Sequence, residues 1–154
     1  MNVNIALLTV TDTRTFENDK SGAILVKKIE ESKHTLIDRK IFKDNKKDIL
    51  KILRDWTKQK NIDVIITTGG TGLTGRDITP EAIDEIADKQ IPGFGEVFRT
   101  ISLKTVGTSA IQSRACAVLA NGKYIFALPG SSGGVTDASP LAKPTGEFPE
   151  PVIL

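Results

Sequence analysis

The sequence has 154 residues, of which 21 are Lys or Arg and 19 are Asp or Glu, so its formal net charge is only +2. This length predicts one domain with a substantial core, and the near-balanced charge argues against a nucleic-acid or membrane surface. A single Cys and a single His argue against an internal disulfide, a Cys- or His-based metal centre and a Ser-His-Asp triad. No signal peptide or long apolar segment stands out, which predicts a cytoplasmic protein.

The first predicted element is a strand over residues 3–10, an almost continuous apolar run typical of a strand buried on both faces of a parallel sheet. Polar residues follow it directly, and open α/β sheets bind ligands where such strands end. Thr11, Asp12 and Thr13 are therefore candidate site residues. An ordinary turn, in which Asp12 bonds to its own backbone, would use the same residues.

A polar loop then leads into a helix predicted over residues 21–32, with Ser21 as its expected N-cap. The start of this helix could face the same pocket as the residues after the first strand. This adds Ser21 and Gly22 to the candidate site.

A second strand is predicted over residues 36–42, and Asp44 is again an acid at a strand end. It could serve the site, or Asp44 or Asn45 could cap the next helix. That helix carries apolar residues at helical spacing, among them Trp56, which we expect in the core rather than against a cofactor.

The most informative stretch follows a short predicted strand over residues 63–66. Four glycines stand within seven positions: Gly69, Gly70, Gly72 and Gly75. Glycines allow positive φ angles and bring backbone N–H groups close to a bound group, so this loop suits an anion.

Arg76 and Asp77 follow the last of these glycines. The guanidinium offers a fork for phosphate or carboxylate, whereas the natural partner of the Asp77 carboxylate is a cation. Mg²⁺ is usually held by one or two carboxylates together with substrate phosphates. The stretch therefore predicts a site for a metal-bound phosphate, although a tight turn with a surface ion pair would need the same two charges.

The glycine spacing matches two known loops only in part. The dinucleotide-binding spacing is present, but the next helix is expected from Thr79, with Pro80 in its first turn, which is later than in a Rossmann unit. The P-loop spacing is present too, but Arg76 and Asp77 stand where Lys and Ser or Thr are required. A nicotinamide-dependent oxidoreductase is therefore a distant alternative.

The helix that Thr79 is expected to cap should run to about residue 89, with Glu81 near the positive end of its dipole. Strand–helix alternation up to this point predicts an α/β fold with a mostly parallel sheet. Residues 91–96 are expected to break the chain before a short helix with an aromatic face. Two strands over 115–120 and 124–128, joined by the type I′ turn signal Asn-Gly, then predict an antiparallel hairpin.

Further candidates for anion binding lie in the second half of the chain. Thr108, Ser109 and Ser113 offer hydroxyls, and Arg114 offers a guanidinium. A second glycine-rich loop, which starts with Pro129, Gly130 and Ser131, follows the last strand. Two such loops at strand ends could converge on one extended, phosphate-bearing ligand.

Together these motifs resemble the MoaB/MogA family of molybdenum cofactor biosynthesis proteins, and more closely its MoaB branch. The resemblance runs from about residue 4 to residue 132. It rests on the segments 8–14, 19–22, 68–82, 92–99, 107–109 with 113–114, and 128–131.

The resemblance implies a three-layer α/β/α fold, assembled as a homotrimer or as a dimer of trimers. It also implies that molybdopterin is joined to AMP from Mg-ATP with release of pyrophosphate. By motif position, the implied catalytic and Mg²⁺-binding residues are Asp77 and Asp44. The candidate substrate-binding residues are Thr11, Asp12, Ser21, Gly22, Thr68, Gly69, Gly70, Thr71, Gly72, Arg76, Pro80, Glu81, Ser109, Arg114, Pro129, Gly130 and Ser131.

One alternative function and one departure from the family remain. A non-catalytic molybdopterin-binding protein of the MoaB branch would carry the same motifs. We expect a single molybdopterin-binding domain over residues 1–139 and a proline-rich tail over 140–154, which holds four of the seven prolines. Family members usually continue past the second glycine loop with a helix and a longer basic segment, of which residues 132–154 keep little.

Overall fold

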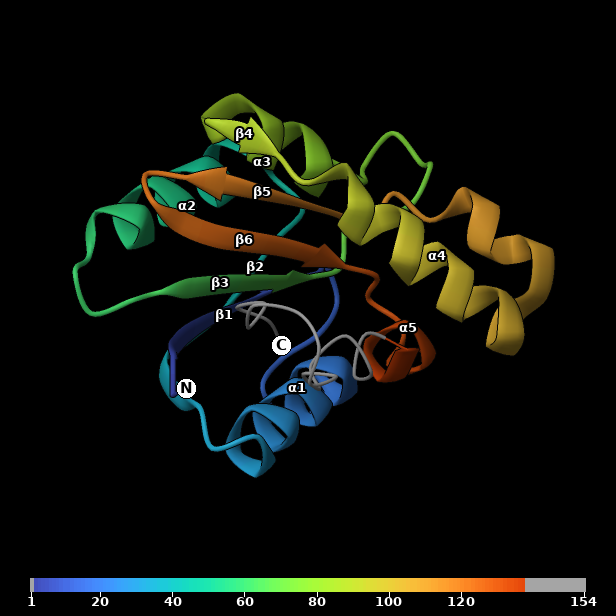
Figure 1. The fold of residues 1–154 in the computed structure, drawn as a ribbon, viewed down its shortest axis with the longest axis horizontal. Coiled ribbons are helices and arrows are strands. Elements are labelled where there is room, and N and C mark those ends of the chain that lie inside the picture. Colours follow the sequence, from blue (N-terminus) through green and yellow to red (C-terminus); the bar gives the residue numbers. More distant parts are fainter. Residues whose placement is uncertain (1, 138–154) are drawn as a thin grey trace.

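The computed structural model describes residues 2–137, which form one mixed sheet flanked by helices (Figure 1). The predicted tail over 140–154 lies outside the described residues. The strands are β1 (Asn4–Val10), β2 (Thr35–Phe42), β3 (Val64–Thr68), β4 (Lys89–Gln90), β5 (Cys116–Ala120) and β6 (Lys123–Leu128). The helices are α1 (Lys20–Glu31), α2 (Lys46–Lys58), α3 (Thr79–Ile86), α4 (Pro92–Val106) and α5 (Ser132–Asp137), with the 3-10 helix η1 (Gly107–Gln112) after α4.

The six strands lie in the order β2-β1-β3-β6-β5-β4, and the neighbours from β2 to β6 run parallel. The predicted hairpin is confirmed, because β5 pairs antiparallel with β6 around Asn121 and Gly122, whose φ angles of 48° and 75° suit a type I′ turn. The predicted α/β fold, mostly parallel with antiparallel pairing at one edge, is therefore confirmed.

Side chains that alternate along the strands build two cores, one on each face of the sheet. On β1, Ala6 and Leu8 pack toward α2 and α3, whereas Ile5 and Leu7 pack toward α1 and α4. Trp56 of α2 is fully buried in the first core, as predicted. The α/β/α layering follows, because a strand this apolar on both faces needs helices on both sides. No helix within residues 2–137 is long and apolar enough to cross a membrane.

Two predicted helix caps are wrong. Asp19, not Ser21, caps α1, and its carboxylate accepts a hydrogen bond from the backbone N–H of Gly22 at 3.0 Å. Ile78 precedes α3 without a side-chain cap, because the hydroxyl of Thr79 donates instead to the carbonyl of Gly69 at 3.0 Å. Of the two residues predicted as possible caps of α2, Asp44 and Asn45, it is Asn45 that caps the helix, since its side chain accepts from the backbone N–H of Lys47.

The segment between α3 and α4 also differs from prediction. Helix α3 ends at Ile86 rather than near residue 89, because β4 (Lys89–Gln90) pairs with β5 at the edge of the sheet. Pro92 does not break the chain but starts α4, where its missing N–H is tolerated in the first turn. The helix continues to Val106, well beyond the short helix predicted.

A buried carboxylate joins the first two strands to the first helix. Asp19, only 2% exposed, accepts hydrogen bonds from the Thr9 hydroxyl at 2.7 Å and the Arg39 guanidinium at 3.0 Å, in addition to its α1 contacts. Burial acts to raise the pKa of Asp19, but the bonds from Thr9, Gly22, Arg39 and Ser21 together lower it. Gly22 is required beside it, because a Cβ there would lie 2.0 Å from a carboxylate oxygen.

Asp19→Asn is expected to lower the free energy of unfolding by about 3 kcal/mol, because it leaves the Arg39 charge without its buried partner. The lowered pKa means that the charge stabilises the fold above the ordinary value of 3.8 and that this stabilisation is lost as pH falls through the lowered pKa. The variant should therefore depend less on pH in that acid range. Urea unfolding at pH 7 and in acid measures both effects.

Glu17→Gln is the matched control, since Glu17 is an exposed acid in the same loop. It should change the free energy of unfolding by less than about 0.5 kcal/mol. Equal stability of Asp19→Asn and the parent protein would show that the buried network does not hold these elements together.

Candidate functional site

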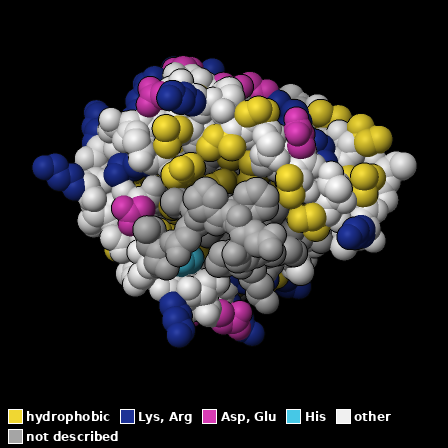
Figure 2. All heavy atoms as spheres, viewed as in Figure 1, with side chains coloured by type: hydrophobic (Ala, Val, Ile, Leu, Met, Phe, Trp, Pro, Cys, Tyr) yellow, Lys and Arg dark blue, Asp and Glu magenta, His cyan; other side chains and the backbone are white. Residues whose placement is uncertain are grey.

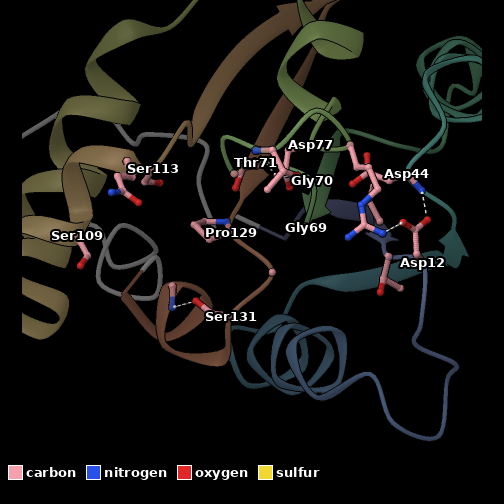
Figure 3. A pocket seen from close by; sticks show the side chains of 18 of the residues that line it. Asp12, Asp44, Gly69, Gly70, Thr71, Asp77, Ser109, Ser113, Pro129 and Ser131 are labelled. Carbon is pink, nitrogen blue, oxygen red and sulfur yellow. Dashed lines mark hydrogen bonds and ion pairs between the residues drawn. The ribbon is translucent and has the colours of Figure 1, made fainter.

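A cavity of about 630 Å³ opens at the carboxyl ends of β1, β3 and β6. The loop after β1 leads to α1 on one face of the sheet, whereas the loop after β3 leads to α3 on the other face, so the two loops diverge. Open α/β sheets bind ligands at such a switch point. The predicted site residues that line the cavity are Thr11, Asp12, Thr13, Asp44, Gly69, Gly70, Thr71, Gly72, Arg76, Asp77, Ser109, Ser113, Pro129, Gly130 and Ser131 (Figure 3).

Backbone contacts between strands place the first glycine loop. Gly69 has a φ of 100°, and a Cβ there would lie 2.1 Å from the carbonyl oxygen of Val10, so only glycine fits beside β1. The N–H of Gly69 donates to the carbonyl of Leu128 at 3.0 Å. The hydroxyl of Thr68 donates to the carbonyl of Pro129, also at 3.0 Å. The two glycine-rich loops are thereby fixed against each other.

Asp77 is held in its charged form by the loop around it. One carboxylate oxygen accepts from the Thr74 hydroxyl at 2.5 Å and from the Thr74 backbone N–H at 2.9 Å. The hydroxyl bond is the main cause of the lowered pKa of Asp77, with further help from backbone N–H groups of Thr74 and Gly72 and from the charge of Arg114. Asp77 is therefore ionised and fixed in orientation at neutral pH.

Asp44 lies in the opposite electrostatic situation. Burial first, and then the charges of Asp77 and Asp12, raise the pKa of its carboxyl. One carboxylate oxygen, Oδ1, is buried without a hydrogen-bond partner among the described residues. Asp12 faces the same end of the cavity, where it accepts from the Asp44 backbone N–H at 3.3 Å and pairs with the exposed Arg76 at 3.4 Å. These acids converge without enough cations to neutralise them.

The carboxylates have the chemistry to bind a Mg²⁺ ion together with phosphates from outside the chain. Within residues 2–137 no group of three or more His, Cys, Asp or Glu side chains is placed to hold a metal alone. Mg²⁺ does not need such a cage, because it usually takes one or two carboxylates together with phosphates and water. The unpartnered Oδ1 of Asp44 and the carboxylate of Asp77 supply the hard oxygen ligands that this ion prefers.

The remaining predicted residues lie behind the cavity wall. Ser21 and Gly22 belong to the network around Asp19, and Thr68 contacts the second glycine loop from the end of β3. Pro80 and Glu81 lie in the first turn of α3. Their positions suit support of the wall rather than contact with a ligand inside the cavity.

Arg114 also lies behind the wall, where its guanidinium grips the first glycine loop. It donates to the carbonyls of Gly72 at 2.8 Å and Asp77 at 2.7 Å, and it forms an ion pair with Glu81. With its donors engaged in this way, Arg114 positions the loop instead of offering a free fork to an anion.

Two groups of lining residues were not predicted as site residues. Arg14 reaches from the loop after β1 to donate to the hydroxyl of Ser21 at 2.9 Å and the carbonyl of Gly130 at 3.0 Å. Its place next to Thr13 was the available sequence signal. Helix α4 and the segment after it contribute Phe98, Ser102, Val106, Ala110 and Gln112. Spacing alone predicts a buried helix face there, and only the tertiary fold shows that this face borders the cavity.

Comparison with known proteins gives consistent matches over most of the chain. The sequence family described as "Probable molybdopterin binding domain" matches residues 6–144. A Bacillus cereus protein named Molybdenum cofactor biosynthesis protein B is 43% identical over 134 residues, which cover 86% of this chain and 79% of the relative.

Solved structures agree with this sequence match. A crystal structure of a Molybdenum cofactor biosynthesis protein B is similar with a TM-score of 0.86 and 42% identity, over 89% of this chain and 86% of that one. The tungsten cofactor synthesizing protein MoaB from Pyrococcus furiosus is similar with a TM-score of 0.82 and 34% identity, over 91% of this chain and 89% of that one.

Asp44→Asn is expected to raise the melting temperature at pH 7 by about 1–3 °C. Because the raised pKa means that the native state holds this proton more tightly than the unfolded chain, the charge destabilises the fold as pH rises above the ordinary value of 3.8. The gain should be complete at neutral pH and should vanish as pH falls below about 4. Thermal melts of both proteins across this range measure it, and a variant that melts lower at pH 7 would contradict the account.

Proposed function

The chain belongs to the MoaB/MogA family of molybdenum cofactor biosynthesis proteins, and on this premise we propose that it binds molybdopterin in the cavity and adenylylates it with Mg-ATP. The observation that carries the proposal is the convergence of Asp12, Asp44 and Asp77 beside two glycine-rich loops at one end of the cavity. Carboxylates crowded in this way favour a cation, and loops of this kind favour phosphates.

In the proposed reaction, an oxygen of the terminal phosphate of molybdopterin attacks the α-phosphorus of ATP. A new P–O bond forms, the bond between the α-phosphorus and the bridging oxygen of pyrophosphate breaks, and pyrophosphate leaves with that electron pair. The attacking phosphate is already an anion at neutral pH, so no Ser, Cys or His is needed to activate it. This agrees with a chain that has one Cys and one His.

The residues of the chain would act by alignment and charge placement. Asp77, fixed by Thr74, and Asp44, with its unpartnered oxygen, would hold Mg²⁺, which supplies charge neutralisation to the phosphates of ATP. Backbone N–H groups of the loops from Gly69 and from Pro129 would orient the two anions. Arg114 would keep the first loop in place from behind.

A non-catalytic molybdopterin-binding protein is the second candidate. The observation in its favour is that one Asp77 oxygen already accepts two hydrogen bonds. The unpartnered Asp44 oxygen favours the enzyme. A carboxylate that destabilises the fold has a role if it binds a catalytic cation, but none in a protein that only binds molybdopterin.

The decisive experiment incubates the purified protein with molybdopterin, ATP and Mg²⁺ and measures adenylylated molybdopterin and pyrophosphate. Product is expected from the parent protein. Asp77→Asn should lower turnover by at least about 100-fold, because it removes a charge that acts on the transferring phosphoryl group. The affinity for molybdopterin should change much less, since binding of its pterin ring does not require the metal.

Asp55→Asn serves as the control, because Asp55 is an exposed acid on α2 and does not line the cavity. It should turn over like the parent protein. Bound molybdopterin without product would favour the binding protein, and equal turnover by Asp77→Asn and the parent would refute the metal role.

We further propose that the protein assembles as a homotrimer or a dimer of trimers. Apolar side chains gather on α4 and η1, where Val97, Leu103 and Ile111 are about half or more exposed, and Figure 2 shows yellow side chains on this side of the molecule. Such a group of exposed apolar side chains is typical of an interaction surface. Sedimentation equilibrium should give three or six times the monomer mass, and Ile111→Asp should shift it toward monomer. A monomeric parent protein would contradict the proposal.

A further inference from the structure

Helix α4 packs closely against the connection between η1 and β5, residues 113–115. A Cβ at Gly95 would lie 2.8 Å from the carbonyl oxygen of Ala115 and 2.8 Å from Nη2 of Arg99, so a larger residue would push the helix away. This close approach brings the Arg99 guanidinium to the connection. Its Nη1 donates to the carbonyls of Ser113 and Ala115, at 3.2 Å each.

The Arg99 guanidinium serves these carbonyls rather than an acid. Within residues 2–137 no Asp or Glu lies within ion-pair distance of it. Hydrogen bonds from a charged donor are stronger than those between neutral groups. The connection lies outside the sheet, since η1 ends at Gln112 and β5 begins at Cys116. Arg99 therefore fixes a part of the chain that no strand pairing holds.

Arg114 stands between the two carbonyls that Arg99 holds, and it contacts the first glycine loop three times. Its guanidinium donates to the carbonyls of Gly72 at 2.8 Å and Asp77 at 2.7 Å. Its backbone N–H donates to the carbonyl of Thr71 at 3.3 Å. A shift of the connection would therefore move the loop, and Asp77 with it.

We propose that Arg99 is a positioning residue that sets the carboxylate of Asp77 through Arg114. The inference rests on the proposed function, which makes Asp77 a ligand of Mg²⁺. Arg99 does not line the cavity, so it acts without touching a ligand there. It holds the connection from which Arg114 reaches the loop. Without its two hydrogen bonds the connection is free to move, and the loop holds Asp77 less firmly.

Arg99→Met removes the donors and keeps an unbranched apolar stem, and amide hydrogen exchange of the ligand-free protein measures its effect. Exchange in the loop over 72–77 should become about tenfold faster, because two hydrogen bonds from a charged group are lost. The amide of Thr74 is the direct reporter, since it donates to Asp77. Strands β1 and β3 should exchange as in the parent protein. Uniformly faster exchange across the sheet would show a purely structural role and would overturn the inference.

The same change in an Arg114→Met background tests the route. If Arg99 acts through Arg114, the double variant should exchange its loop no faster than Arg114→Met alone. Additive effects would overturn the proposed route. Arg99→Lys keeps a charged donor for one carbonyl, so it should retain part of the protection that Arg99→Met loses. It also supplies the same test, with a smaller effect, if Arg99→Met does not fold.

Lys104→Met is the matched control, since Lys104 is an exposed cation on the same helix. It should leave both loop exchange and turnover at the values of the parent protein. An equal effect of Lys104→Met and Arg99→Met on the loop would show that any lost charge on α4 suffices, and would overturn the inference.

Turnover gives a second measurement. Arg99→Met should lower kcat about tenfold and change the KM for molybdopterin by less than about twofold, because Asp77 acts on the transferring phosphoryl group. A rise in KM alone, or unchanged exchange and kcat, would overturn the inference. A parent protein that forms no product would refute the proposed reaction, whereas the exchange measurement would still decide whether Arg99 holds the loop.

Discussion

The cavity depends on the buried carboxylate of Asp19. This one group accepts hydrogen bonds from β1 through Thr9, from β2 through Arg39 and from the start of α1 through Gly22. It therefore sets the path of the loop after β1, which brings Asp12 and Arg14 to the cavity. Arg14 extends the same network to Gly130 in the second glycine loop. A buried charge with this many donors specifies one arrangement of the strands and helices around it.

The proposed metal site combines two carboxylates in contrasting surroundings. The hydroxyl and N–H of Thr74 satisfy Asp77, whereas burial and like charges oppose the ionisation of Asp44. A cation bound between them would relieve the repulsion and supply the missing partner of Asp44. The charged form of Asp44 destabilises the protein when no cation is bound. A bound cation would remove this destabilisation, which would favour the cation-bound state.

The sequence predicts the elements whose signals are local. Asn45 caps α2 with bonds to residues two and three positions away, and the hairpin turn needs only Asn121 and Gly122. Prediction failed where a distant contact decides the outcome. Thr79 is a good capping residue, but its hydroxyl donates to the distant carbonyl of Gly69 instead. The two-residue strand β4 likewise forms only because it pairs with β5.

The same distinction holds for the site. The sequence predicts acids and glycines at strand ends as site residues, because the carboxyl ends of parallel strands meet at one edge of the sheet. The sequence does not predict that α4 lines the cavity, since only the packed fold brings Ser102 there. The spacing of Arg114 likewise could not reveal that its guanidinium binds the backbone of a loop from the other half of the chain.

The pairing of β3 with β6 has a consequence for how the protein folds. The β5–β6 hairpin closes a short turn, whereas the bond from Gly69 to Leu128 joins opposite halves of the chain and costs far more loop-closure entropy. The two glycine loops therefore meet only after the central pairing is complete. Partly folded chains have no cavity, so a ligand that binds there would stabilise the fully folded protein alone and would protect even distant strands from opening.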